Sequence, residues 1–586
     1  MACWRIAEWL RRWSKGRRSP AGSRRPRAFW TLRIEALEDR LTPADVFWTG
    51  AGDGVNWGDA RNWSSGALPG AADDVTIQAA PDVSVHFNVF GNATINSLQS
   101  SNSLVMDLGS LTLDAASEID ATLTLSGALA TLAAGGDLGV QDLIQTSGTF
   151  TGAGNLTIHD QWAWTSGSMT GTGHTVLDST ALATLSGGFF SMLVDRTVDN
   201  WGTATAVNNG FDFQGSAAWN NRPGSLFTLQ DGAALGNFFA GPASRFNNHG
   251  LLDVQDGLGT STIGIPLQNA GEVDLESGTL NLSGGGAARG GFHLADGTVL
   301  SISSDYALNR HAGVSGSGTL QVTIFHTLTV AGHVHIPNLT VSGGTVTVNG
   351  SLVIGNLTES GGTVGGPGEM TINNHWTWTG GNMTGPGRTV LNGTATLSGG
   401  FFSMLDGRTV DNHGIATAAS DGIDFRNSAI WNNLRGSTFV LGNAASLGNF
   451  FAGAAQFNNA GLLVKNGSGT SVIGFDLNNT GRLDIDNTGT LQVAGDFSQS
   501  AFGSLQIDIG GTAAESFGQL NVSGAALLDG NLTVQLVGGF IPSTGDSFQI
   551  LTFGTRGDSP TDFASENLPT GLIPVFGPNN LSLVAT

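Results

Sequence analysis

The chain has 586 residues, a net charge of −22 and only 12% charged residues, and 88 of its residues are glycine. This mixture of Gly with Ser, Thr, Asn and Val favours short strands and tight turns over helices. The acidic charge excludes nucleic acid and anionic lipid as partners of the body, the single cysteine excludes an intramolecular disulfide, and no apolar run is long enough for a membrane-spanning helix.

Residues 1–45 form a basic leader. Residues 1–40 hold 11 of the 24 Lys and Arg residues but four of the 46 acidic residues, so the 13 basic and 42 acidic residues that follow give the body a charge of −29. The leader lacks the uninterrupted apolar segment of a standard secretory signal peptide, and we expect it to be disordered or removed. A nucleic-acid-binding arm is the less favoured interpretation of its charge.

The end of the leader carries the sequence RIEALEDRLTPA at residues 33–44. It resembles the N-terminal motif of many predicted extracellular proteins of planctomycete bacteria. The matching residues are Glu35, Leu37, Glu38, Arg40, Leu41 and Pro43. The resemblance covers about a dozen residues and implies export, while the missing apolar segment leaves the route open.

Residues 46–77 are expected to form an N-terminal cap. Three spaced tryptophans, a Pro-Gly turn and an acidic pair precede the first strand, and this order resembles the opening of bacterial surface β-solenoids, including autotransporter-like passengers. The tryptophans are Trp48, Trp57 and Trp63. A solenoid needs a lid on its open apolar end, and large aromatic side chains supply one. The loop Gly52–Asp59 has the oxygen donors of a calcium loop, but without a series of such loops a turn of the cap is favoured.

Short alternating apolar runs separated by turns predict β-solenoid coils over 78–144. A long duplication follows, in which LSGGFFSML, TVDN and LGNFFAG each occur twice and QWAWTSGSMTG returns as HWTWTGGNMTG. We therefore predict one copy at 145–285 and a second at 359–495, joined without a flexible linker by further coils at 286–358. Residues 496–586, which contain QIDIGG and LDGNLTVQL, resemble the C-terminal segment of the same solenoid families and are expected to end the stack as coils and a cap.

Within each copy, Asn-rich turns recur about every 20–27 residues, the length of one coil of a β-helix. Stacked coils place like residues above one another at about 4.8 Å, which suits ladders of asparagine. Pairs of Phe at 189–190, 238–239, 401–402 and 450–451 are expected to stack or to line the core. The predicted fold is all-β, an elongated parallel β-solenoid of roughly 20–25 coils, right-handed as the resemblance implies.

Catalytic chemistry has few candidates in this sequence. Asp199 and Asp411, and likewise Asp212 and Asp424, occupy equivalent positions of the two copies. A catalytic site normally exists once, so these duplicated carboxylates are interpreted as parts of turns or ladders. His333 and His335 lie two apart on one strand face, but no third metal ligand accompanies them, and no metal or other cofactor is predicted.

Two tryptophan pairs are the candidate ligand-binding residues. Trp162 and Trp164 in the first copy, and Trp376 and Trp378 in the second, alternate with small residues, so each pair shares one face of a strand. On the outside they would form a platform for stacking on carbohydrate. On the inside they would belong to the core, which is favoured because burial of so much apolar area stabilises the fold.

The sequence therefore predicts a non-enzymatic, exported protein of the cell surface or extracellular space with a structural or adhesive role. The alternatives are a carbohydrate-binding protein and a polysaccharide-active β-helix enzyme. A single carboxylate cluster on one solenoid face would favour the enzyme. Possible partners are polysaccharides and other surface proteins.

Overall fold

The computed structural model describes residues 44–586 except 237–242, 420–421, 449–453 and 558–561. In this part of the chain the regular elements are 57 β-strands and two short 3-10 turns, and there is no α-helix. None of the described residues forms a helix that is long and apolar enough to cross a membrane. The basic leader lies almost entirely outside the described residues, in a unit of its own at 1–42.

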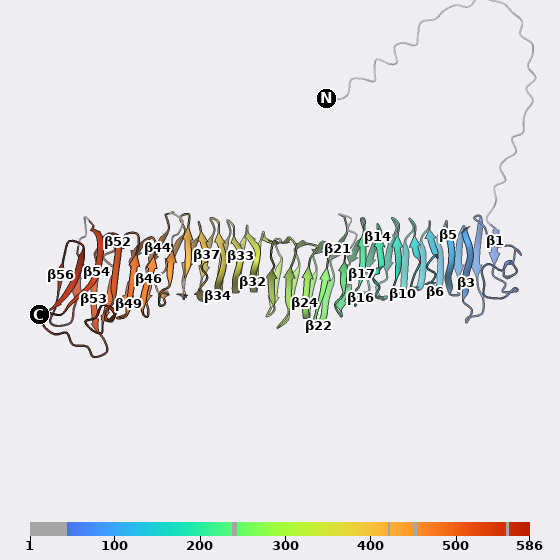
Figure 1. Ribbon diagram of the computed structural model, residues 1–586. Helices are drawn as coiled ribbons and strands as arrows, with labels where there is room; N and C mark the ends of the chain where they lie inside the picture. The colour runs from blue at the N-terminus through green and yellow to red at the C-terminus, as the bar shows by residue number, and fades with distance from the viewer. Residues whose placement is uncertain (1–43, 237–242, 420–421, 449–453, 558–561) are drawn as a thin grey trace, which may run out of the picture. The chain divides into compact units, whose positions relative to one another are not determined.

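The strands stack in parallel, coil upon coil (Figure 1). The strand pairing divides the coils into three faces, A, B and C. Face A contains β12 (His174–Leu177), face B contains β13 (Leu182–Leu185) and face C contains β14 (Gly188–Val194). Each of these strands pairs with the strand three elements further along the chain. These partners are β15 (Thr197–Asn200), β16 (Thr203–Val207) and β17 (Phe211–Gln214) respectively. This pattern confirms the predicted parallel β-solenoid.

The core fills the inside of the coils. Side chains alternate between the inside and the outside along each strand, as the pleat requires, and inward positions of successive coils form continuous apolar columns. One such column on face A contains Val198, Trp219, Phe246 and Leu267, which are paired one coil after another and fully buried. Burial on this scale, repeated in every coil, is the main stabilising contribution to the fold.

The two copies of the repeat occupy different faces of the stack. Val198, from TVDN of the first copy, lies in β15 (Thr197–Asn200) on face A. The pairing continues from Val198 through Trp219, Phe246, Leu267, Gly286, Tyr306, Leu328, Val346 and Val364 to Met383. The counterpart of Met383 in the first copy is Met169 of β11 (Gly167–Thr170), which lies on face C. The coils between the copies therefore displace the second copy by one face.

Both ends of the stack carry distinct structures. At the first end, β1 (Ala44–Phe47) pairs with β2 (Asp73–Ile77), and Trp48, Trp57 and Trp63 are buried in edge-to-face contacts over the first coil. At the other end the pairing changes from parallel to antiparallel. There β57 (Asn580–Ala585) lies between β54 (Ser547–Arg556) and β56 (Leu572–Phe576). A change of strand direction ends the repetitive edge that a further coil would extend.

Candidate functional site

The four tryptophans predicted as candidate ligands lie in the core. Trp162, Trp164, Trp376 and Trp378 are each at most 1% exposed. The rings of each pair are stacked, with centroids 5.5 Å apart in the first copy and 4.9 Å apart in the second. A ring enclosed by other coils has no face available to a sugar. The carbohydrate-stacking platform is therefore wrong at these positions, and the core position that the sequence favoured is the one found. Burial of the large rings accounts for their inward orientation.

A buried ladder of asparagine side chains connects successive coils on face A. Asn200 Nδ2 donates to Asn221 Oδ1 at 2.9 Å, Asn221 Nδ2 to Asn248 Oδ1 at 2.8 Å, and Asn248 Nδ2 to Asn269 Oδ1 at 2.9 Å. The second hydrogen of each amide reaches a backbone carbonyl of the following turn, as for Asn221 and Leu251. The second copy repeats the ladder through Asn412, Asn433, Asn459 and Asn479. This inner ladder satisfies polar groups that would otherwise be buried without partners.

A second, outer ladder runs beside it and ends on a carboxylate. Asn247 Nδ2 donates to Asn220 Oδ1, and Asn220 Nδ2 donates to Asp199 Oδ1, both at 2.7 Å. Asp199 also accepts hydrogen bonds from His174 Nδ1 at 2.7 Å and from Arg222 Nη2 at 2.6 Å. Burial opposes ionisation, but the hydrogen bonds from His174, Asn220 and Arg222 outweigh it and hold the pKa of Asp199 below its usual range.

The second copy uses its aspartate in the same way. Asp411 accepts from Asn432 Nδ2 at 2.6 Å and forms an ion pair with Arg388, which stands where the first copy has His174. The other duplicated pair, Asp212 and Asp424, is 1% exposed in both copies. In this structure Asp199 and Asp411 are the ends of ladders, in agreement with the interpretation of duplicated carboxylates as architecture.

Each copy also encloses one arginine completely. Arg196 donates from Nε to Thr175 Oγ1 at 2.7 Å and from its two amino groups to the carbonyls of Gly152, Thr170, Gly154 and His174. Arg408 repeats these contacts with Thr389 and four carbonyls of the second copy. Burial lowers the pKa of Arg196 to about 10, so the side chain remains a cation at neutral pH. Its planar array of donors connects the coil of Arg196 to carbonyl groups of the two preceding coils.

Three side chains of the first copy project from stacked turns at the corner between faces A and B. Trp201, Arg222 and His249 follow the ladder residues, and their backbone N–H groups donate to Leu177, Asn200 and Asn221 of the preceding coil. Trp201 is 46% exposed and is the one exposed tryptophan among the described residues. The Arg222 guanidinium lies over its ring, 5.5 Å from the centroid. We call Trp201, Arg222 and His249 the corner strip.

The second copy has a different strip on the same scaffold. His413, Leu434 and Ala460 make the equivalent backbone hydrogen bonds, yet none is the residue found in the first copy. The corner strip could not be predicted from the residues that the two copies share, because its three side chains differ between them. The signal in the sequence that could have identified it is a difference between the copies. Residues of the scaffold are the same in both copies, whereas an outward residue that binds a partner can differ.

A carboxylate cluster lies on the outside of face B at the end of the first copy. Asp253, which is 7% exposed, pairs in register with Asp274 of the next coil, and Glu276 lies close by. Asp253 Oδ2 accepts from Gln255 Nε2 at 2.7 Å, and its Oδ1 has no hydrogen-bond partner. Burial, followed by the charges of Glu276 and Asp274, raises the pKa of Asp253 to about 6. The second copy has Val464 in place of Asp253, so the cluster occurs once.

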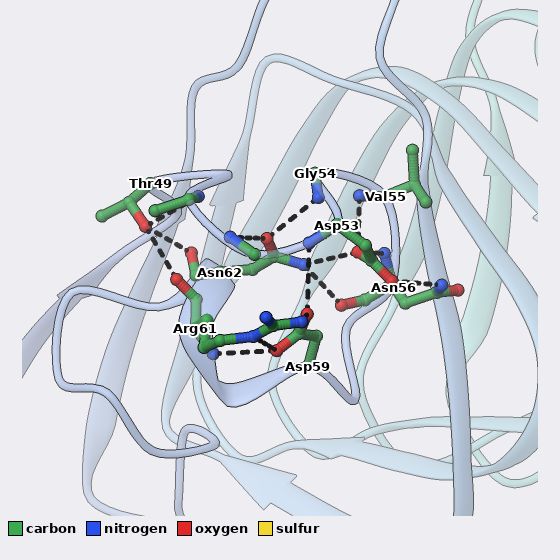
Figure 2. A network of polar contacts seen from close by, with 10 residues as sticks. Thr49, Asp53, Gly54, Val55, Asn56, Asp59, Arg61 and Asn62 are labelled. Carbon is green, nitrogen blue, oxygen red and sulfur yellow. Dashed lines mark hydrogen bonds and ion pairs between the residues drawn. The ribbon is translucent and has the colours of Figure 1, made fainter.

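The loop with calcium-type donors is a hydrogen-bonded turn of the N-terminal cap (Figure 2). Asn62 Oδ1 accepts from the backbone of Gly52 and Gly54, and its Nδ2 donates to Asp53 Oδ1 at 2.9 Å. Asp59 accepts from Arg61 Nη2 at 2.7 Å. Hydrogen bonds, first from the backbone of Asn56, hold the pKa of Asp53 far below its usual range. These carboxylates bind N–H donors, which a calcium ion would have to displace.

The remaining predicted residues contribute little to a site. His333 and His335 point outward on β32 (His333–Val348), and His333 Nδ1 lies 2.6 Å from Ser351 Oγ. No group of three or more His, Cys, Asp or Glu side chains suited to a metal ion occurs within the described residues. Of the predicted Phe pairs, Phe190 is exposed and does not line the core. The other Phe side chains of these pairs lie outside the described residues.

Comparison with known proteins gives only a distant structural likeness. No family model matches the chain, and no curated protein matches it. A solved structure, the crystal structure of the Haemophilus influenzae Hap adhesin, aligns over 90% of this chain and 65% of its own length, with 13% identity and a TM-score of 0.32. The chain thus spans less than two thirds of that protein. Such a likeness carries no argument about a site or an activity.

Proposed function

We propose that the chain is a non-enzymatic, exported β-solenoid protein that acts as a structural or adhesive component of the cell surface or the extracellular space. The observation that carries the proposal is the use of the duplicated polar residues. The asparagine ladders, the aspartates that end them and the enclosed arginines of both copies all connect one coil to the next. Polar contacts that recur in both copies and connect successive coils are suited to maintaining a long surface for display.

Two measurements test this role. Antibodies against the protein, applied to intact source cells and followed by mild protease treatment, should label the surface, and the label should be lost on treatment. Beads coated with the full chain should be retained on cells or on extracellular matrix more strongly than beads coated with albumin. Protection of the protein inside intact cells, or equal retention of both bead types, would contradict the proposal.

A polysaccharide-active enzyme is the second candidate, favoured by the carboxylate cluster of Asp253, Asp274 and Glu276. A carboxyl group whose pKa is raised, with further carboxyl groups beside it, is the arrangement that general acid catalysis of glycosidic bond cleavage requires. If this candidate holds, incubation with polysaccharides releases reducing ends at a rate that depends on a group of pKa about 6, and Asp253→Asn abolishes the release. An unchanged substrate after prolonged incubation removes the candidate.

A further inference from the structure

The corner strip combines features that a purely structural surface does not need. Trp201 leaves nearly half of its area in water, whereas the other described tryptophans are all buried. Arg222 is held in place by Asp199, which binds both Nε and Nη2, at 3.1 and 2.6 Å. Asp199 is itself held by His174 and Asn220. The exposed ring therefore has a fixed hydrogen-bond donor over it, and that donor is anchored to the buried ladder.

This chemistry suits a sugar. An indole ring offers an apolar face to the C–H groups of a pyranose, and guanidinium and imidazole groups donate to its hydroxyls. The three side chains project from successive coils, which are about 4.8 Å apart, a spacing comparable with the length of one hexopyranose residue. A glycan chain lying along the corner would thus meet one side chain of the strip for each sugar.

Charge selects the class of glycan. The body carries an excess of 29 acidic residues, which repels polyanions at long range. Within the strip, the charge of Arg222 is compensated by its ion pair with Asp199 at 2.6 Å. The corner strip therefore lacks the uncompensated cations that a uronate or sulfated polymer requires.

We propose that Trp201, Arg222 and His249 form a binding site for a neutral hexopyranose polysaccharide that runs along the corner of the first copy. This inference deepens the proposed function, on which it rests, by naming a glycan as the partner of the surface protein. The second copy, with His413, Leu434 and Ala460 at the equivalent places, keeps the scaffold and lacks this site.

The second copy supplies the variants for the test. Trp201→His, Arg222→Leu and His249→Ala each install the residue that the same scaffold already accommodates, and His413→Ala is the matched control in the second copy. The full chain is measured against soluble mixed-linkage β-glucan, galactomannan and pullulan, with alginate as the acidic comparison. Binding is followed by calorimetry and by acrylamide quenching, in which the difference between the parent and Trp201→His isolates the signal of Trp201.

We expect at least one neutral glycan to bind and to protect Trp201 from quenching, and Trp201→His to weaken binding about tenfold or more. His413→Ala should leave the affinity unchanged, and Trp201→His, His249→Ala and His413→Ala should unfold at the temperature of the parent. Failure of the parent to bind any neutral glycan, tighter binding of alginate, or full affinity in Trp201→His would overturn the inference. If any of these results is found while beads coated with the parent protein are still retained on cells, the glycan-binding site is wrong but the adhesive role is supported. Failure of the site is therefore distinguishable from failure of the proposed function.

Discussion

Glu359 in the second copy occupies the core position that Gln145 holds in the first. Each lies one coil before a buried tryptophan, Trp378 and Trp164 respectively. Gln145 Nε2 donates to the carbonyls of Gly148 and Ser168, at 3.3 and 3.1 Å. Glu359 is fully buried, and neither of its side-chain oxygens has a hydrogen-bond partner. Burial raises the pKa of Glu359 well above 4.5, although the charge of Arg408 opposes the shift.

Replacement of Glu359 by Gln should stabilise the protein in a pH-dependent manner. The folded protein keeps a proton on Glu359 at pH values where the unfolded chain has released it. Raising the pH above the ordinary glutamate value of 4.5 therefore lowers the free energy of unfolding of the parent. At pH 8 we expect Glu359→Gln to raise that free energy by about 1–3 kcal/mol, and at pH 4 by much less, as measured by urea unfolding.

The reverse change in the first copy is the matched control. Gln145→Glu should destabilise the protein more at pH 8 than at pH 4, because it places a second ionisable group in an equivalent environment. Equal urea midpoints for Glu359→Gln and the parent across this pH range would show that Glu359 is not held as a neutral acid.

Loss of an enclosed arginine should destabilise its copy strongly. Arg196→Met keeps much of the apolar stem but leaves Thr175 and four carbonyl groups without their donor. We expect the free energy of unfolding to fall by about 3–5 kcal/mol. This should be measurable as a lower unfolding temperature and as faster amide exchange in the coils around Arg196. Arg222→Met, at a half-exposed position, should cost about 1 kcal/mol or less. A similar cost for both would contradict the role assigned to the buried guanidinium.

The inner and outer asparagine ladders should differ in their contribution. Asn221→Ala removes an amide that bonds Asn200, Asn248 and Leu251 inside the protein, and we expect a loss of about 2–4 kcal/mol. Asn220→Ala, in the partly exposed outer ladder, should cost about 1 kcal/mol because water can replace the lost partner. Thermal unfolding of the two variants side by side measures this difference. A lower unfolding temperature for Asn220→Ala than for Asn221→Ala would contradict the greater contribution of the inner ladder to stability.

The N-terminal cap should depend on its buried indoles. Trp57→Ala removes a ring that packs against Trp63 and Phe87, with centroids 4.7 and 5.5 Å away, and we expect a loss of about 3–5 kcal/mol for the cap. An opened cap exposes the first coil to other chains, so light scattering should show self-association. Val55→Ala, at an exposed position of the same cap, serves as the control and should remain monodisperse.

Much of the fold could be predicted from the sequence, because in a solenoid the local and the global patterns coincide. Alternation of apolar residues identified the strands, and the recurrence of Asn200, Asn221 and Asn248 identified one turn of each coil. The orientation of Trp162 and Trp164 could not be decided by alternation, which places both on one side of a strand without saying which side is enclosed. Their burial follows from neighbouring coils, which are distant in sequence.

The candidate site was less accessible to such reasoning. Trp201 and Arg222 are 21 residues apart and meet because their turns stack, so their contact depends on the number of residues in the intervening coil. The ionisation of Asp253 likewise depends on Glu276 and Asp274 of another coil. Repetition in the sequence indicates which residues build the scaffold. Which of the differing outward residues lie next to one another depends on the register of the strands in the structure.

The displacement of the second copy by one face has a consequence for multivalent attachment. Two equal units on the same face would engage one flat partner together and would gain affinity through avidity. Because TVDN of the first copy and TVDN of the second copy lie on different faces, one flat partner cannot contact both in the same way. A partner that lies along one face of the stack therefore meets different parts of the two copies.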